Sequence, residues 1–569
     1  MNDRDKNRRT KFLVGAVAAL TLATHSTFAT NGSWNADSDG NWSDATKWLG
    51  GNIADGAGAT ANFTFNITGS RTITLDSART VGIVNIGDTD GSDIYFFGAA
   101  SGVSLTLDNG PSNAQINQTS TSSVTPFNVP LILNSSLDVI NSSGQALGLQ
   151  GNISAGTAGT KTITVSGGPV EMLGATSDGS GVIAIVYNAS SVLLSNSSDN
   201  NTYSGGTTIN GGTVSIGSSG SPFGSGTLTF SGGALKIQGS RSTALVNNVV
   251  ITGDTVFTAR TGPSNVTALF GGTLTGTGGT LTILSDATST SGLFDVRFSG
   301  GDYTMARPIV LDNGGGAGAV RLNDVSVSGT THTYSGLISG TGRYNRSGGG
   351  LTVFLADNTY TGTTTVTNGT LQLGNGGTTG SLSPSSVISF ASSSGTLIFD
   401  HTSGSDFVQG TNFSSSAITG AGQIIKEGTS SLTFNVANTF SGGLTINKGT
   451  VVATADGALG TGGINLNAAS VTLTLQGGVN PNFIADTATL TIGFNTDTVN
   501  LNYTGTEVVG GLIIEGSPVA PGTYGAGGDF PELMGTGTIT VVPEPTTLAM
   551  MALGASMLVG VQRFRRKLR

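Results

Sequence analysis

The sequence predicts an all-β protein with one elongated body, residues 30–542, between a targeting segment at each end. Glycine accounts for 90 of the 569 residues, while charged residues make up 10% and aromatic residues 6%. Large side chains are therefore too few for several thick globular cores. Val, Ile and Leu fall in short alternating runs that are typical of strands. One short sequence unit also recurs three times, which indicates a repeat architecture.

Residues 1–29 have the pattern of a secretory signal peptide. Basic residues from Arg4 to Lys11 precede an apolar stretch from Phe12 to Leu22, and Thr27-Phe28-Ala29 follow it before a polar segment. We expect cleavage after Ala29, so that the exported chain begins at Thr30. An ordinary first helix is a weak alternative, because nothing nearby would pack on it.

The repeated unit occupies residues 201–217, 358–374 and 438–454, which align without gaps. Each copy reads as an aromatic residue, a glycine turn, a strand, an Asn/Gly turn and a second strand. The dipeptides Asn210-Gly211 and Asn368-Gly369 are expected to supply the positive φ angles that these turns need. No helical period is evident between residues 30 and 540, so strand and turn alternate along the body.

This unit resembles the autotransporter-associated β-strand repeat of large bacterial surface proteins. The resemblance implies a parallel β-helix, which we expect to be right-handed. Stacked short strands satisfy one another's backbone groups, and small polar residues suit the corners between them. Asn201, Asn358 and Asn438 are candidates for corner positions. A chain of β-sandwiches is the alternative fold.

Residues 543–569 combine three features in order. They are the sequence Pro543-Glu544-Pro545, an uncharged stretch from Thr546 to Val561, and a basic end that contains Arg563 and Arg569. As a helix, residues 546–561 would span roughly 24 Å, and the basic side chains can extend to the membrane surface. Basic flanks stay cytoplasmic, so a transmembrane helix here would leave the body outside the inner membrane.

This tail resembles the PEP-CTERM sorting signal of Gram-negative bacteria. The resemblance implies that an exosortase, a membrane cysteine protease, cleaves near Pro543, Glu544 and Pro545. It also implies that the body is released to, or held at, the cell surface after transient anchoring. A simple C-terminal membrane anchor is the alternative. The tail is a helix with charges rather than the strands of a membrane barrel, so export through a barrel of its own is not expected.

The net charge of the body limits the classes of partner that it can be expected to bind. Outside residues 1–29 and 546–569 the chain has 14 Lys or Arg and 31 Asp or Glu residues, a net charge of −17. This excess of negative charge disfavours nucleic acid. Exopolysaccharide or another component of the cell envelope is the expected partner besides the exosortase. The absence of cysteine rules out disulfides and thiolate metal sites.

Three tryptophans, Trp34, Trp42 and Trp48, gather at the start of the body. A repeat stack must cover its first rung, so we interpret them as a cap. A platform on which sugars stack is the functional alternative. The segments 37–41 and 88–93 resemble calcium loops only weakly, because the usual glutamate is missing from the first, and solvated turns explain both.

The sequence contains no convincing catalytic, cofactor or metal motif. His332 and His401 are far apart in the sequence, and neither has other potential ligands at a metal-binding spacing. Residues 286–346 mix both charges at irregular spacing, for which scattered surface ion pairs are a sufficient explanation. The enzymatic alternative, a β-helix polysaccharide lyase or hydrolase, would need carboxylates from this segment in one groove. We therefore predict a non-catalytic surface protein that serves as a structural, matrix or adhesion scaffold.

Overall fold

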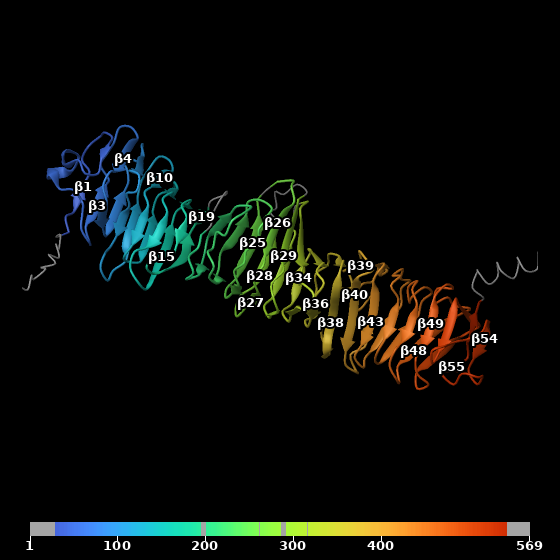
Figure 1. The fold of residues 1–569 in the computed structure, drawn as a ribbon. Coiled ribbons are helices and arrows are strands. Elements are labelled where there is room, and N and C mark those ends of the chain that lie inside the picture. The colour runs from blue at the N-terminus through green and yellow to red at the C-terminus, as the bar shows by residue number, and fades with distance from the viewer. Residues whose placement is uncertain (1–28, 195–200, 261, 286–291, 316, 543–569) are drawn as a thin grey trace, which may run out of the picture.

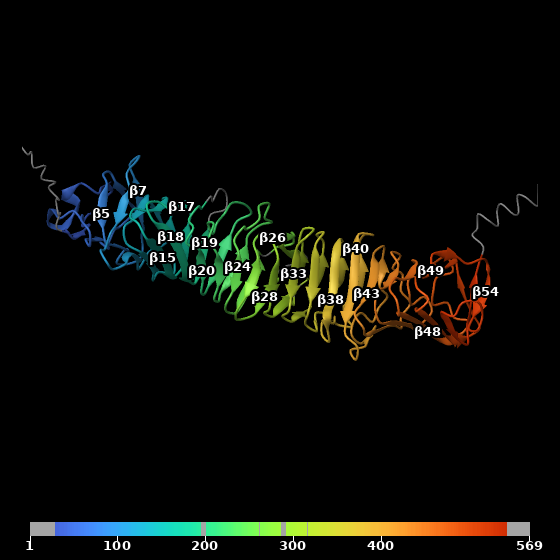
Figure 2. The same cartoon turned by 60° about the horizontal axis from the view of Figure 1, so that its bottom comes forward.

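The computed structural model describes residues 29–194, 201–260, 262–285, 292–315 and 317–542. Over these residues the chain winds into an elongated β-solenoid, with its first coils at one end and its last coils at the other (Figure 1, Figure 2). The predicted all-β stack of parallel strands is therefore confirmed. The helical targeting segments predicted before Ala29 and after Val542 lie outside the described residues, and the right-handed sense stays a prediction.

Short strands form because apolar residues alternate with polar ones. In the strands Leu105–Leu107 and Leu131–Leu133, for example, the first and third side chains are buried and the middle one faces outward. Each coil thus contributes a few inward side chains to a narrow core. The buried apolar residues join into one cluster that extends from Trp34 to Val541. A long core built from small increments explains how so few aromatic residues suffice.

Three sheets cover the first half of the solenoid. Sheet 1 consists of β1 (Gly32–Ser33), β3 (Thr60–Phe63), β6 (Ile83–Ile86), β9 (Ala114–Gln118), β12 (Leu137–Asn141), β15 (Thr160–Gly167), β18 (Val182–Ala189), β20 (Thr207–Ile209), β22 (Leu228–Phe230), β24 (Val249–Ile251) and β27 (Leu274–Gly276). Sheet 2 consists of β2 (Gly40–Asn41), β4 (Arg71–Leu75), β7 (Tyr95–Ala99), β10 (Thr125–Asn128), β13 (Leu147–Leu149), β16 (Val170–Met172), β19 (Ser191–Leu194), β21 (Thr213–Ile216), β23 (Ala234–Ile237), β25 (Thr255–Ala259), β28 (Leu281–Leu284), β31 (Ile309–Asp312) and β34 (Ile338–Gly340). Sheet 3 consists of β5 (Arg79–Val81), β8 (Leu105–Leu107), β11 (Leu131–Leu133), β14 (Ile153–Ala155) and β17 (Thr176–Ser177).

Four sheets cover the second half. Sheet 4 consists of β26 (Val266–Phe270), β29 (Leu293–Phe298), β32 (Ala319–Asp324), β35 (Arg343–Arg346), β37 (Thr364–Val366), β39 (Ile388–Phe390) and β42 (Thr419–Gly420). Sheet 5 consists of β30 (Tyr303–Met305), β33 (Thr331–Tyr334), β36 (Leu351–Phe354), β38 (Gly369–Gly377), β40 (Gly395–His401), β43 (Gln423–Glu427), β45 (Leu444–Ile446), β47 (Ile464–Leu466), β49 (Thr489–Ile492), β52 (Gly511–Ile514) and β53 (Ser517–Pro518). Sheet 6 consists of β41 (Phe407–Val408), β44 (Ser431–Phe434), β46 (Thr450–Ala453), β48 (Thr472–Val479), β50 (Thr498–Thr504) and β55 (Leu533–Gly535), and sheet 7 of β51 (Thr506–Val509), β56 (Thr538–Val541) and β54 (Gly522–Gly525).

Strands pair in parallel from one coil to the next. Among the described strands, the antiparallel pairs are β52 with β53 and β54 with β56, both at the C-terminal end. These two reversals close the end of the stack, which would otherwise leave unpaired strand edges. The alternative of consecutive β-sandwiches is wrong, because sandwiches are built from antiparallel sheets.

The three repeat copies form the same pair of strands. These pairs are β20 with β21, β37 with β38, and β45 with β46, and they lie in different sheets of the solenoid. A copy therefore fixes a local path of strand, turn and strand, whereas its place around the solenoid depends on the segments between copies.

The turn within each copy needs a positive φ angle at one glycine, and the sequence located it correctly in only one of the two copies named. In the second copy it is Gly369, with a φ of 68°, as expected. In the first copy it is Gly212, with a φ of 64°, rather than Gly211. A Cβ at Gly212 would lie 1.8 Å from the Ala189 carbonyl oxygen on the preceding coil, so only glycine allows this close approach.

The N-terminal end is closed by the three tryptophans. Trp34, Trp42 and Trp48 are at most 3% exposed, and their rings pack against Phe63 at centroid distances of 5.0 to 6.0 Å. The indole nitrogens of Trp42 and Trp48 donate to the backbone oxygens of Ala54 and Trp42. The short 3₁₀ helices η1 (Ala45–Lys47) and η2 (Leu49–Gly51) belong to the same segment. The capping interpretation is therefore confirmed, and an exposed platform for sugars is wrong.

Candidate functional site

The described fold begins at Ala29 and ends at Val542, next to the two predicted processing positions in the sequence. Ala29 is exposed, and Thr30 begins the fold by exchanging backbone hydrogen bonds with Asp55 at 2.8 and 3.0 Å. At the other end the Val542 amide donates to the Val509 carbonyl at 3.2 Å. Pro543, Glu544 and Pro545 lie outside the described residues, as does the predicted span 546–561. The helices that the structure describes are too short and too polar to cross a bilayer.

The asparagines predicted at corners each connect three coils. The side-chain oxygen of Asn438 accepts from the Ile418 amide at 2.7 Å, and its side-chain nitrogen donates to the Ala458 carbonyl at 2.7 Å. Asn358 repeats both contacts, with Ile338 at 2.8 Å and Ser381 at 3.5 Å. Asn201 accepts from Thr176 and donates to Pro222 in the same way. Only a side chain with both a donor and an acceptor can make this link.

The charged segment that the sequence marked at 286–346 divides into an outer and an inner group. Asp295, Arg297 and Arg321 face outward from sheet 4, whereas Asp324 and Arg346 point into the core and are fully buried. The prediction that all these charges are surface ion pairs is thus wrong for the inner group. Successive side chains of a strand point to opposite faces of the sheet. Asp and Arg occur at both kinds of position in this segment, so some face the solvent and others face the core.

In the outer group, one carboxylate holds two arginines. Arg321 donates to both oxygens of Asp295 at 2.8 Å, and Arg297 donates to Asp295 Oδ2 at 2.6 Å. Burial raises the pKa of Asp295, but the hydrogen bonds from Arg321 and Arg297 outweigh this effect, so the pKa is lowered. Asp295 is therefore ionised, and both of its oxygens already accept from arginine. It is poorly placed to act as a general acid.

In the inner group, Asp324 lies between a histidine and an arginine. Asp324 Oδ1 is 3.0 Å from His332 Nδ1 and 3.5 Å from the Arg346 guanidinium. His332 Nε2 faces the Gly300 carbonyl at 3.1 Å. Tyr303 and Tyr334, whose hydroxyl groups are 2.7 Å apart, complete the cluster, and burial raises their pKa well above the usual value. No substrate can reach this cluster, because all its members are buried.

Two buried cations, Arg346 and Lys426, lie near the C-terminal ends of β35 and β43 and point into the core. Arg346 donates to the Asp324 and Ser326 carbonyls of the preceding coil, and Lys426 donates to the Gly428 carbonyl at 2.6 Å. Both precede the corner asparagine of their copy by the same number of positions. Burial lowers the pKa of Lys426 to about 8. These cations satisfy carbonyl groups of the turns, which is a structural role.

The remaining polar residues singled out by the sequence also have structural roles. His401 is buried and stacks on Phe407 at a centroid distance of 3.5 Å, and burial lowers its pKa to about 4. Asp37 and Asp39 accept amides from Thr68 and Thr72 on the next coil. Within the described ranges no three His, Cys, Asp or Glu side chains converge as metal ligands.

The prediction that residues 88–93 form a solvated turn is wrong for Asp88. Asp88 is only 1% exposed, and its oxygens accept from the amides of Ile67, Ser92 and Asp93. Asp88 therefore organises the loop from inside. The sequence signal was the run of Asp, Ser and Gly, which is equally typical of exposed turns.

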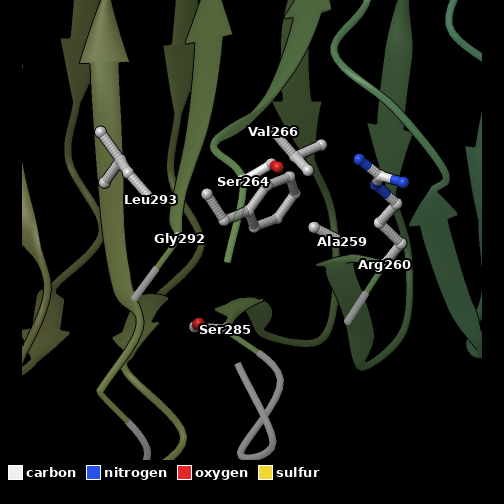
Figure 3. Close-up of a pocket in the computed structure, with 8 residues that line it drawn as sticks. Ala259, Arg260, Ser264, Val266, Ser285, Gly292 and Leu293 are labelled. Atoms are coloured by element: carbon white, nitrogen blue, oxygen red, sulfur yellow. The ribbon is translucent and has the colours of Figure 1, made fainter. Parts of the chain in front are cut away.

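Pockets on the described part of the solenoid range in volume from about 10 Å³ to about 700 Å³. Figure 3 shows a pocket between the starts of β26 and β29, with Arg260, Ser264 and Leu293 around it. Its volume is about 10 Å³, room for about one water molecule. A larger hollow of about 700 Å³ is open to solvent at the C-terminal cap, where Tyr524, Phe530 and Glu532 line it.

Two families match parts of the chain, and both agree with the resemblances seen in the sequence. Residues 192–216, 346–373 and 424–453 match the family described as passenger-associated-transport-repeat. Each match covers most of one repeat copy. Residues 541–567 match the PEP-CTERM protein-sorting motif, and this range includes Pro543, Glu544 and Pro545. No solved structure matches the chain.

A curated relative is the Adhesin BmaC autotransporter of Brucella suis biovar 1 (strain 1330). It is 31% identical over an alignment of 260 residues, which covers 42% of this chain and 6% of that protein. The chain thus spans a small fraction of the relative's length. The chain therefore carries passenger-associated-transport repeats in its solenoid and a PEP-CTERM protein-sorting motif at residues 541–567.

Proposed function

We propose that this protein is exported and sorted to the bacterial surface, where its solenoid is a non-catalytic scaffold for adhesion or for the extracellular matrix. The observation that carries the proposal is the position of the sorting motif directly after a closed repeat body. Signal peptide, body and tail are then three units: residues 1–29, 30–542 and 543–569.

Processing at both ends is part of the proposal. A signal peptidase cleaves after Ala29, and residues 546–561 hold the chain in the inner membrane until an exosortase cleaves near Pro543, Glu544 and Pro545. The exposed Ala29 and the early fixation of Thr30 by Asp55 support the first cleavage. The last described strand ends at Val541, which supports the second, because cleavage near Pro543 would leave that strand intact.

An elongated solenoid suits a scaffold for a physical reason. Contacts join each coil to its neighbours, so length can grow without a larger core, and every coil presents new outer surface. The similarity to part of an adhesin supports the proposal that the outer surface of the solenoid binds to another surface. Exopolysaccharide or another envelope component is the proposed partner.

The enzymatic alternative, a polysaccharide lyase or hydrolase, has little support. Glycosidases need two carboxyl groups that face one groove and the scissile bond. In the segment 286–346, where the enzymatic alternative would require such a pair, Asp295 is held by two arginines and Asp324 is buried in the core. The two groups thus lie on opposite sides of sheet 4.

The mass and location of the chain in its own cell test the proposal. We expect the extracellular form to begin at Thr30 and to lack residues 546–569, as measured by intact mass spectrometry. Replacement of Pro543-Glu544-Pro545 by three alanines should keep the tail on and hold the chain in the inner membrane. An extracellular form that retains the tail would contradict sorting by processing.

Catalysis is tested separately. Incubation of the purified protein with the exopolysaccharide of its own organism should release no soluble sugar, measured as new reducing ends and unsaturated products. Sugar release that stays with the protein through chromatography, and that is lost when a carboxylate in residues 286–346 is replaced, would establish the enzymatic alternative instead.

A further inference from the structure

Positive charge is concentrated on one stretch of the body. Five of the 14 Lys and Arg residues between residues 30 and 545 lie within residues 297–346, although the body as a whole is acidic. Three of the five, Arg297 on β29, Arg321 on β32 and Arg343 on β35, project outward from adjacent strands of sheet 4. Their inward neighbours Phe298, Leu322 and Tyr344 are buried in the core, which fixes the direction of the arginines.

The three arginines have one carboxylate among them. Asp295 is bound by Arg297 and Arg321, so one negative charge faces three positive ones. Within the described residues the exposed side chain of Arg343 has no hydrogen bond or ion pair. Arg343 also lies directly opposite Arg321 in the strand register. Like charges at opposite positions destabilise a sheet, and a carboxylate between them would remove this repulsion.

Hydrogen-bonding groups continue the surface beside the arginines. The next row across the strands consists of Asn323, Asn345, Thr365 and Ser389, which are in register. Ser347 donates to Asn323 at 2.7 Å, and Thr367 donates to Asn345 at 3.0 Å. These contacts cover the two asparagines, so the hydroxyl groups of Ser347, Thr365, Thr367 and Ser389 form the accessible part of the surface.

The spacing of these hydroxyl groups follows the solenoid. Adjacent strands are about 4.8 Å apart, close to the length of one sugar ring. Ser347 and Thr367 already donate their hydroxyl hydrogens, and the Thr365 and Ser389 hydroxyl groups are hydrogen-bonded to each other at 3.3 Å. All four oxygens can still accept from sugar hydroxyl groups, and one of the last two can still donate. The surface thus presents mainly acceptor oxygens at successive steps along the solenoid axis.

We propose that the outer face of sheet 4 binds a carboxylated polysaccharide, with a carboxylate between Arg321 and Arg343 and sugar hydroxyl groups on the side chains from Ser347 to Ser389. A protein partner fits this surface less well, because it has no outward aromatic anchor and its outward leucines, Leu269 and Leu293, are only partly exposed. Nucleic acid fits less well too, since its affinity depends on many phosphate contacts and the net excess here is only two charges. The inference rests on the proposed function and names a ligand class for the scaffold.

The test compares two charge-matched variants of the full chain, extracted in detergent. Arg343→Gln removes the unpaired arginine of sheet 4, and Lys448→Gln removes an exposed cation in the turn between β45 and β46. The probes are polygalacturonate, neutral dextran and double-stranded DNA. Both variants share the basic termini of the unaltered chain, so binding to those termini cannot separate them. Far-UV circular dichroism and thermal melting check that both variants are folded.

We expect the unaltered chain to bind polygalacturonate in a salt-dependent manner and not to bind dextran. Arg343→Gln should weaken this binding about fivefold, corresponding to one partly exposed ion pair, while Lys448→Gln leaves it unchanged. No binding of polygalacturonate, equal weakening by both variants, or tighter Arg343-dependent binding of DNA would each overturn the inference. Surface localisation is measured independently, so its failure with intact binding would refute only the proposed function.

Discussion

At the scale of single residues, the solenoid depends on side chains that bond to two neighbouring coils at once. The corner asparagine of each copy accepts an amide from the coil before it and donates to a carbonyl of the coil after it. Aspartate can make the first contact but lacks the donor for the second. This explains why the copies share an asparagine at this corner, whereas Asp is sufficient where a single amide is accepted, as at Asp254 and Asp302.

Asn358→Asp should therefore destabilise the middle of the solenoid although it changes only one atom group. The substitution removes the side-chain donor to the Ala356 and Ser381 carbonyls, of which Ser381 keeps the backbone amide of residue 358, and it buries a carboxyl group. We expect a loss of about 1–3 kcal/mol in the free energy of unfolding, measured by urea titration. Asn368→Asp is the matched control, because Asn368 is exposed in the same copy and uses only its oxygen, toward the Gly369 amide. Equal effects of the two would contradict the bridging role.

At the scale of elements, the sequence predicted the strands better than the turns. The copies correctly located β20, β37 and β45 and the strands after them, because alternating apolar residues in short runs leave little choice of phase. The position of the positive φ angle in the first copy was wrong by one residue. Gly211 and Gly212 are chemically identical, and only the approach of the preceding coil decides which of them needs to be glycine.

The two glycines of this turn provide a direct comparison. Gly212→Ala should cost more than about 1 kcal/mol, because φ is positive there and the new Cβ would collide with the Ala189 carbonyl. Gly211→Ala has no neighbour within 4 Å of the new Cβ, so it should be neutral or slightly stabilising. Hydrogen exchange of the β20 and β21 amides resolves the local effect of each. A greater loss of protection in Gly211→Ala would reverse the assignment of the turn.

The buried charges could not be predicted from the sequence for a different reason. Lys426 follows two consecutive isoleucines, and Arg346 lies between Asn345 and Ser347, so the sequence next to each cation does not separate an inward from an outward position. Their partners include carbonyl groups of turns on other coils, which are distant in the sequence. Such partners become evident only when the register of the stack is known. The outward arginines of sheet 4 raised the same difficulty, because Arg321 and Arg343 become neighbours only through the pairing of β32 with β35.

At the scale of the whole molecule, the two ends determine whether the rod remains a single unit. Parallel coils expose unpaired backbone groups at both ends of the stack, and an uncovered end invites pairing with another molecule. The C-terminal end is covered by the reversed strands β53 and β54, whereas the N-terminal end depends on the tryptophan segment. Because each coil contacts only its neighbours, loss of a cap should act first on the adjacent coils and then through association of molecules.

Trp42→Ala tests this role of the N-terminal cap. Trp42 is 1% exposed and packs on Phe63, which belongs to β3 of the first complete coil. Its removal should cost about 3–5 kcal/mol locally, and the uncovered strands should then join end to end. We expect faster exchange of the β3 and β6 amides and a concentration-dependent rise in mass by light scattering. Leu49→Ala, an apolar truncation in the same segment at a residue that is 59% exposed, should leave both measurements unchanged. A variant of Trp42 that loses protection along the whole rod at once, without association, would show instead that the coils unfold as one cooperative unit.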